Sequence, residues 1–252
     1  MAMNASDGAA PAEVVAPAKL TTSLRITGVR DDGYHLIDAE MVSLDLADTL
    51  ELRPGDRAVS YDGPHAQPVA PEADLVLKAL DLVRREADVM VTKHIPAGGG
   101  LGGGSSDAAA VLRWAGFDDL EAAARLGADV PFCLVGGRAR VRGIGELIDP
   151  LPFEARTYTF VLPPFGCSTP GVYRRWDELG GPGGDNGNDL EPAALSYEPR
   201  LAAWRDRLGE ETGETPRLAG SGSTWFVEGA FPGGGRLVSS TIAAPIDPNQ
   251  GA

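Results

Sequence analysis

Between Val14 and Asp62 the chain alternates hydrophobic and polar positions with the period of two that is typical of β-strands. The alternating runs are separated by turn signals, and Asp32-Gly33 predicts a hairpin turn. Strands are predicted at residues 20–26, 39–46, 49–53 and 58–61. This part of the protein is therefore expected to begin as a β meander.

From residue 74 onward the hydrophobic positions recur at the spacing of an α-helix. Asp74 is a candidate N-cap for a helix over residues 75–83, and residues 88–95 are predicted to form a strand. A run of glycines follows at positions 98–104, and the alanine-rich residues 108–114 predict a second helix. The expected local order is strand, glycine loop, helix.

The rest of the chain mixes short helices and strands. Residues 129–131 are expected to be extended, because the residue before a proline avoids the α region, and residues 149–152 are expected to form a linker. Helices are predicted at residues 120–126, 170–179 and 198–208, and strands at 138–142, 157–162, 225–227 and 237–242. The predicted organisation is a disordered tail (1–13), an N-terminal domain (14–150) and a smaller α+β domain (151–252).

The charge balance narrows the classes of partner. Among 252 residues, 36 Asp and Glu stand against 22 Lys and Arg, which gives a formal net charge of −14. Such a surface repels nucleic acids and anionic lipids at long range, so neither is an expected partner. Only three lysines are present, Lys19, Lys78 and Lys93, so an anionic ligand must be bound largely by other donors such as backbone N–H groups.

The cysteines and histidines argue against a disulfide-stabilised fold and against a metal site. Cys133 and Cys167 provide no disulfide framework, and the three histidines lie at no metal-ligand spacing. No apolar run reaches the roughly 20 residues of a membrane span. The N-terminus lacks the pattern of a signal peptide, so we expect a cytoplasmic protein.

The glycine run is the clearest chemical signal. Six of the seven positions 98–104 are glycine, and Ser105-Ser106-Asp107 then opens a helix. Glycines let the backbone N–H groups approach an anion, and a helix N-terminus adds partial positive charge, so the pattern predicts phosphate binding. The alternative is a connecting loop in which Ser105 merely caps the helix. The Walker A motif is excluded because this run contains no lysine. A dinucleotide-binding motif is excluded because no second strand ending in an acidic residue follows the helix.

The segment from Pro96 to Ala109 closely resembles the central motif of the GHMP kinases, the small-molecule kinases related to galactokinase, homoserine kinase and mevalonate kinase. Further segments resemble motifs of this family in the same order along the chain: residues 16–20, 28–35, 126–132, 188–191 and 220–223. The resemblance covers about residues 14–243. Residues 28–35, which end in Tyr34-His35, are similar to the signature of the branch whose second substrate is a cytidine-diphosphate-linked polyol.

The resemblance implies an α+β, two-domain GHMP-kinase-like fold. Its N-terminal domain would be ribosomal-protein-S5-domain-2-like, its C-terminal domain ferredoxin-like, and the active site would lie between them. The implied activity is transfer of the γ-phosphoryl group of ATP, with Mg²⁺, to the 2-hydroxyl of the polyol. Alternatives are a kinase of the mevalonate or homoserine type and a non-catalytic nucleotide-binding protein on the same scaffold.

The resemblance also implies roles for single residues. Asp129 would take the hydroxyl proton and Lys19 would orient the hydroxyl; an isolated charge in the apolar run around Lys19 would be costly, and Asp129 could pair with it. Otherwise they would be an ordinary turn residue and a solvated strand residue. Ser106 is the candidate Mg²⁺ ligand, and Asp107 either assists or only complements the helix dipole. The ATP phosphates would lie on Pro96, Gly98, Gly99, Gly100, Leu101, Gly102, Gly103, Gly104, Ser105 and Ser106.

The second substrate would be bound by residues from both halves. In the resembled branch Tyr34 and His35 hold the cytosine ring, and Tyr173 is the candidate for a second stacking partner, unless it is an ordinary core residue. Thr21 stands where the family usually has asparagine, and its hydroxyl replaces only part of an amide's hydrogen bonding. The C-terminal glycine motif would be Gly220, Ser221, Gly222 and Ser223. ATP and the cytidine-diphosphate-linked polyol are the expected small-molecule partners of a monomer or homodimer.

Overall fold

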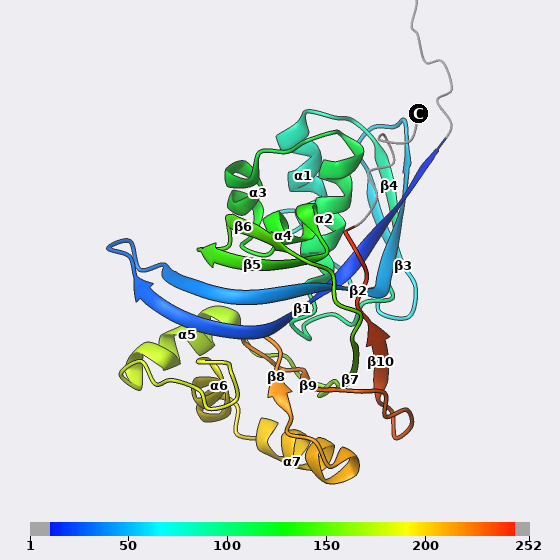
Figure 1. Ribbon diagram of the computed structural model, residues 1–252. Helices are drawn as coiled ribbons and strands as arrows, with labels where there is room; N and C mark the ends of the chain where they lie inside the picture. Colours follow the sequence, from blue (N-terminus) through cyan, green and yellow to red (C-terminus); the bar gives the residue numbers. More distant parts are fainter. Residues whose placement is uncertain (1–10, 245–252) are drawn as a thin grey trace, which may run out of the picture.

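The computed structural model describes residues 11–244. Most of the predicted disordered tail, residues 1–13, lies outside the described residues, and strand β1 (Ala12–Val29) begins before residue 14. It pairs antiparallel with β2 (His35–Arg53), and the turn between them contains the predicted Asp32-Gly33. In Figure 1 this hairpin is the long blue ribbon that crosses the middle of the molecule.

Strand β2 is the centre of the first sheet, whose order is β3-β4-β2-β5-β6 with β1 also on β2. Its last residues pair with β4 (Asp88–Thr92) and its first residues pair with β5 (Arg138–Gly143). Strand β3 (Val59–Asp62) pairs with β4 in parallel. The predicted meander and the predicted break after residue 46 are therefore wrong, because β2 is one continuous strand that changes partners along its length.

The predicted linker at residues 149–152 is also wrong. Residues 149–151 belong to β6 (Leu147–Leu151), which pairs antiparallel with β5. Pro150 is tolerated there because β6 is an edge strand, where a missing N–H leaves no ladder bond unmade. The cross-strand ion pair between Arg142 and Asp149, 2.8 Å long, helps to hold this edge.

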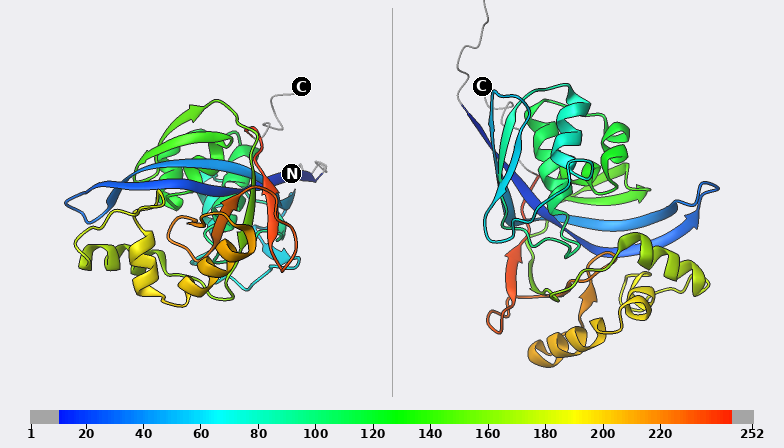
Figure 2. Two further views of the ribbon diagram at one scale, coloured as in Figure 1. Left: turned by 60° about the horizontal axis from the view of Figure 1, so that its bottom comes forward. Right: turned by 180° about the vertical axis from the view of Figure 1, so that it is seen from behind.

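Helices α1–α4 pack on one face of the first sheet (Figure 2). They are α1 (Leu75–Val83), α2 (Gly103–Trp114), α3 (Leu120–Leu126) and α4 (Val130–Val135). The predicted N-cap Asp74 accepts hydrogen bonds from the first turn of α1. The expectation of an extended segment at 129–131 is wrong, because Pro131 lies in the first turn of α4, where a proline leaves no helical hydrogen bond unmade.

The second sheet lies on the other side of the hairpin (Figure 1) and has the order β10-β7-β9-β8. Its strands are β7 (Thr157–Val161), β8 (Arg217–Leu218), β9 (Trp225–Glu228) and β10 (Leu237–Ser240). Helices α5 (Thr169–Glu178), α6 (Glu191–Tyr197) and α7 (Leu201–Thr212) accompany it. The sequence did not predict α6 and β8, and α7 begins three residues later than expected. Tyr158, Phe160 and Phe226 form a buried aromatic core.

The segment Asn188-Asp189 joins the two halves near the hairpin. Asp189 accepts hydrogen bonds from Arg25 (2.6 Å) and from the backbone N–H of Ile26 (2.9 Å). Asn188 donates to the carbonyl oxygen of Gly220 at 2.7 Å. Burial alone would raise the pKa of Asp189, but its hydrogen bonds outweigh burial and hold the pKa below its ordinary value. The carboxylate therefore stays charged and fixes β1 to the C-terminal half.

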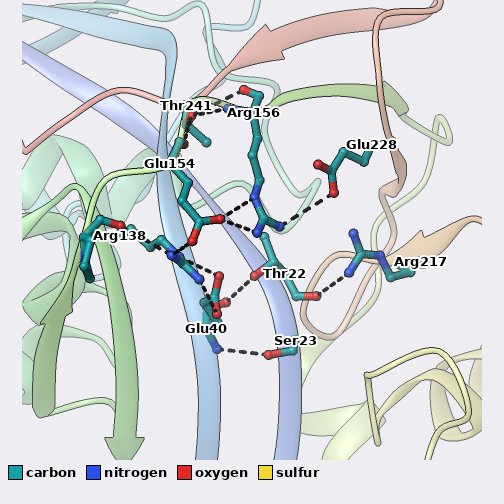
Figure 3. A network of polar contacts seen from close by, with 10 residues as sticks. Thr22, Ser23, Glu40, Arg138, Glu154, Arg156, Arg217, Glu228 and Thr241 are labelled. Atoms are coloured by element: carbon teal, nitrogen blue, oxygen red, sulfur yellow. Dashed lines mark hydrogen bonds and ion pairs between the residues drawn. The ribbon is translucent and has the colours of Figure 1, made fainter.

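A network of charged side chains joins the two sheets on another side (Figure 3). Arg138 pairs with Glu40 at 2.9 Å and also with Glu154, which accepts a hydrogen bond from Arg156 at 3.0 Å. Arg156 lies 3.6 Å from Glu228 of β9. Isolated surface ion pairs contribute little to stability, but this series connects β2 to β9 without a break. The relative position of the sheets, and so the space between them, is fixed on two sides.

Candidate active site

Two cavities meet at the glycine loop, residues 96–102. The larger is a cleft of about 1280 Å³ between the hairpin, the loop and helices α3 and α5; the smaller, of about 300 Å³, adjoins the loop itself. Predicted site residues that line the cleft are Lys19, Thr21, Tyr34, His35, Gly100, Asp129, Tyr173, Gly220 and Ser221. Those that line the smaller cavity are Pro96, Gly98, Gly99, Gly100, Leu101, Gly102, Gly103 and Gly104. Gly100 lines both, so the loop is where they join.

The structure brings Lys19 and Asp129 together, as the sequence predicts. Lys19 is only 4% exposed, and its Nζ lies 3.1 Å from Oδ2 of Asp129 and donates to the hydroxyl of Thr21 at 3.2 Å. The pairing of β1 with β2 shifts register between Pro17 and Lys19 and again between Thr21 and Ser23. Such bulges redirect the side chains beside them. The Asp129 side chain stays one-third exposed, so the buried ammonium is paired with a carboxylate that the cleft can reach.

The glycine loop packs directly on the lysine. The backbone N–H of Lys19 donates to the carbonyl oxygen of Leu101 at 3.0 Å, and Leu101 is buried. Gly102 has a φ of +75° and is the N-cap of α2 without any side-chain hydrogen bond. The alternative in which Ser105 caps the helix is therefore not what the structure has. The first N–H groups of α2 have no side-chain acceptor, which is the arrangement that binds an anion.

Gly102→Ala is expected to lower kcat by about ten- to hundredfold, because displacement of a catalytic group by an ångström has effects of this size. A Cβ atom at position 102 would lie 2.7 Å from Cγ of Lys19. Gly213→Ala is the control, since Gly213 has a similar φ of +74° but no heavy atom within 4 Å of its Cβ position, and it lines neither cavity. It should cost roughly 1 kcal/mol of stability through backbone strain alone. Equal kcat values for the two variants would contradict the contact argument.

Ser106 and Asp107 face the protein interior. The Ser106 hydroxyl is buried and donates to the carbonyl oxygen of Pro17 at 2.6 Å, so this geometry gives no support to its predicted role as a Mg²⁺ ligand. Asp107 accepts a hydrogen bond from Lys93 at 2.5 Å, a contact that the sequence did not predict, and its two expected roles stay predictions. Burial raises the pKa of Asp107 to about 7, although Lys93 opposes the shift. Burial also raises the pKa of the Cys133 thiol, beside Ser106, to about 12, which disfavours the reactive thiolate form.

An aromatic cluster lies at the far end of the cleft. The ring of His35 lies 4.8 Å from that of Tyr173 and 5.6 Å from that of Trp176, measured between centroids. His35 Nε2 is 2.8 Å from Oδ1 of Asp177. Tyr34 is 60% exposed and lines the same cleft. Tyr173 thus packs against His35 and lines the cleft, and its role as a stacking partner stays a prediction.

The sequence missed several residues of the cleft. Arg125 and Arg174 line it without an ion pair to any residue of the described range 11–244, whereas Asp177 pairs with His35. No local pattern could have found them, because they depend on where α3 and α5 lie relative to the hairpin. Conversely, Ser105, Ser106, Gly222 and Ser223 line neither cavity, although Ser221 does and its hydroxyl lies 2.9 Å from that of Thr169.

Comparison with known proteins agrees with this geometry. A family model described as the GHMP kinases N terminal domain matches residues 74–137. The 4-diphosphocytidyl-2-C-methyl-D-erythritol kinase of Paracoccus denitrificans is 39% identical over 235 residues, and 84% of each chain is covered. The chain belongs to the 4-diphosphocytidyl-2-C-methyl-D-erythritol kinase family. The resemblance to GHMP kinases that the sequence suggested is confirmed.

Other members of this kinase family match over similar lengths. The 4-diphosphocytidyl-2-C-methyl-D-erythritol kinase of Ruegeria pomeroyi is 37% identical over 265 residues, covering 93% of this chain and 94% of the relative. A crystal structure of 4-(cytidine 5'-diphospho)-2C-methyl-D-erythritol kinase superposes with a TM-score of 0.72 at 30% identity, covering 91% of this chain and 98% of that chain. The GHMP kinase fold is thus confirmed. No helix within residues 11–244 has the length and apolar character needed to cross a membrane.

Proposed function

We propose that this protein transfers the γ-phosphoryl group of ATP to the 2-hydroxyl of 4-diphosphocytidyl-2-C-methyl-D-erythritol, a step of the non-mevalonate route to isoprenoids. The observation that carries the proposal is the position of the Lys19–Asp129 pair. It lies in the cleft with Tyr34, His35 and Tyr173, against the glycine loop that lines the second cavity. A phosphate donor on one side of the loop and a cytidyl acceptor on the other would meet at this pair.

The glycine loop would hold the phosphates of ATP. A Cβ atom at position 99 would lie 2.9 Å from Thr224, and one at position 100 would lie 3.0 Å from the carbonyl oxygen of Ala219. The loop packs so closely on Thr224 and Ala219 that only glycine fits at these two positions, and the N-terminus of α2 adds backbone N–H donors. This suits a protein of net charge −14, which attracts no polyanion at long range and must bind it locally.

Asp129 would accept the proton of the attacking hydroxyl. As that proton leaves, the hydroxyl oxygen bonds to the γ-phosphorus, the bond from γ-phosphorus to the bridging oxygen breaks, and ADP carries away that oxygen and its electrons. The Lys19 ammonium, 3.1 Å from the carboxylate, would hold Asp129 in place and stabilise charge that develops on the transferred group. Asp129 is one-third exposed, so a hydroxyl in the cleft can reach it.

Magnesium would enter with ATP. Within residues 11–244 no group of three or more His, Cys, Asp or Glu side chains could hold a metal ion. Mg²⁺ commonly keeps several waters and binds largely through substrate phosphates, so a site with few protein ligands can hold it. Bound with ATP, the ion would neutralise phosphate charge.

The cytosine ring would bind at the aromatic end of the cleft. Tyr34 and Tyr173 would provide the stacking faces, and His35, held by Asp177, would provide a directed hydrogen bond to the base. Arg125 and Arg174 are the cations in the same cleft that lack a carboxylate partner within residues 11–244, which suits the diphosphate. Thr21 would bind the polyol beside Lys19.

Release of ADP tests the proposal. Purified protein with ATP, Mg²⁺ and 4-diphosphocytidyl-2-C-methyl-D-erythritol should release ADP, whereas mevalonate or homoserine in its place should not. Turnover of mevalonate or homoserine instead would reassign the substrate. ATP binding without ADP release from any of the three would indicate a non-catalytic protein, an alternative that the intact Lys19–Asp129 pair argues against.

Tyr173→Ala is expected to raise the KM of the cytidyl substrate about tenfold, because a stacking partner is worth roughly 1–3 kcal/mol per base. The KM of ATP should not change, since Tyr173 lines only the larger cleft. Steady-state kinetics with each substrate varied in turn measure both. Tyr173→Phe keeps the ring and should behave like the wild type; a Tyr173→Ala enzyme with unaltered KM for the cytidyl substrate would remove the residue from the binding site.

Several further features of the molecule remain predictions. These are the domain boundary at residues 150–151, the ribosomal-protein-S5-domain-2-like and ferredoxin-like descriptions of the halves, the monomeric or dimeric state and the cytoplasmic location. The two-sheet arrangement around one hairpin supports the division into halves.

A further inference from the structure

A buried cluster of charges lies beneath the glycine loop and takes no part in the chemistry above. Lys93 follows β4, is 8% exposed, and pairs with Asp48 of β2 and with Asp107 of α2. Both carboxylates are buried, and within residues 11–244 the second oxygen of Asp107, Oδ1, is buried without a hydrogen-bond partner. Lys93 and Asp107 also line the smaller cavity together with the whole glycine loop.

The cluster makes hydrogen bonds at both ends of the loop. At the entrance, Oδ1 of Asp48 accepts hydrogen bonds from the backbone N–H groups of His94 (2.5 Å) and Ile95 (2.8 Å), the last residues before Pro96. At the exit, Asp107 lies in the second turn of α2 and accepts from Lys93 Nζ at 2.5 Å. A Cβ atom at Gly103, the first residue of α2, would lie 3.2 Å from that Nζ. One ammonium group therefore connects the strand before the loop to the helix after it.

The connection sets the distance between the two ends of the glycine loop. A loop so rich in glycine has much conformational freedom, so the separation of its two ends must be set by other residues. Charged groups taken out of water are costly, and replacing them with apolar residues often stabilises a fold. A cluster of one cation and two carboxylates under the loop is therefore better explained by positioning than by stability.

We propose that Asp107, acting through Lys93, is a positioning residue that holds the ends of the glycine loop at the separation required by the phosphates of ATP. The inference rests on the proposed function insofar as ATP is the ligand of the loop. Asp107 itself need not contact the phosphates. Its effect is to hold the start of α2, and thus the N–H donors of its first turn, beside the end of β4.

Two substitutions at one position test the proposal. Asp107→Ala removes the connection but keeps a residue with high helix propensity, so α2 should still form. Its Kd for a non-hydrolysable ATP analogue, measured by calorimetry, should rise about ten- to hundredfold, the size expected when a remote change misplaces a site. Asp107→Asn keeps an oxygen that accepts from Lys93, and its Kd should stay within about twofold of the wild type.

Kinetics and a control separate positioning from general instability. Asp107→Ala should raise the KM of ATP and leave the KM of the second substrate unchanged. Asp189→Ala is the matched control, because Asp189 is also a buried, paired carboxylate but lies at the junction of the two halves and lines neither cavity. It should lower Tm without changing the Kd of the ATP analogue.

Three results would overturn the inference: a wild-type Kd in Asp107→Ala, equal losses in Asp107→Ala and Asp107→Asn, or an equal rise of Kd in Asp189→Ala. The calorimetric measurement needs no second substrate. A wrong substrate assignment would therefore show as missing turnover in the wild type, with the Asp107 series still interpretable through the binding of the nucleotide.

Discussion

Asp129→Asn is expected to lower kcat by about a thousandfold, within the range that loss of a general base produces. Asparagine has the same shape and can still accept a hydrogen bond from Lys19, but it cannot take the proton of the attacking hydroxyl. The Asp129 side chain makes no capping hydrogen bond to α4, so α4 should still form, but the buried Lys19 ammonium loses its counter-ion and Tm should fall. ADP release under saturating concentrations of both substrates gives kcat, and thermal unfolding gives Tm.

The substitution Asp129→Asn should affect catalysis and leave nucleotide binding unchanged. The Kd of an ATP analogue should remain close to that of the wild type, because Asp129 does not line the smaller cavity. If Asp129→Asn turned over at the wild-type rate, the proton would have to leave by another route, and the residue would have no catalytic role.

Lys19→Met is expected to lower kcat by about a hundredfold, comparable with removal of one donor that stabilises charge in a transition state. Methionine keeps most of the stem that packs against Gly102 and removes the ammonium. Asp129 is one-third exposed, so its carboxylate regains water and the fold should tolerate the change. The same initial-rate assay measures kcat.

A double substitution distinguishes a shared role from two separate ones. If Lys19 and Asp129 act as a unit, Lys19→Met with Asp129→Asn should be no slower than about the slower single variant. Additive losses would mean that the two residues contribute independently. Lys78→Met is the matched control, since Lys78 lies on α1, lines neither cavity and should keep the wild-type kcat.

Local patterns predicted the parts of this molecule that local physics determines. Asp74 caps α1 as expected, and the strand, glycine loop and helix follow in the predicted order. In both cases the decisive information, a cap or a run of glycines, lies within a few residues of sequence. The pairing of Lys19 with the distant Asp129 is instead implied by the family resemblance.

What the sequence could not reveal depends on long-range pairing. β2 is continuous because two different strands support its two ends, and β6 forms because β5 lies beside it, despite Pro150. Asp48 and Lys93 are 45 positions apart, and neither belongs to a recognisable motif with the other. The arginines of the cleft are likewise placed by the packing of α3 and α5 against the hairpin.

The burial of two of the three lysines has a consequence for chemical labelling. An acylating reagent finds the side-chain amine of Lys78 partly exposed on α1, whereas those of Lys19 and Lys93 are shielded and engaged by carboxylates. Acylation of Lys19 requires the cleft to admit the reagent and the amine to leave Asp129. The labelling rate of Lys19, followed by mass spectrometry of its peptide, therefore reports how often the site opens. Lys78 in the same molecule is the internal reference.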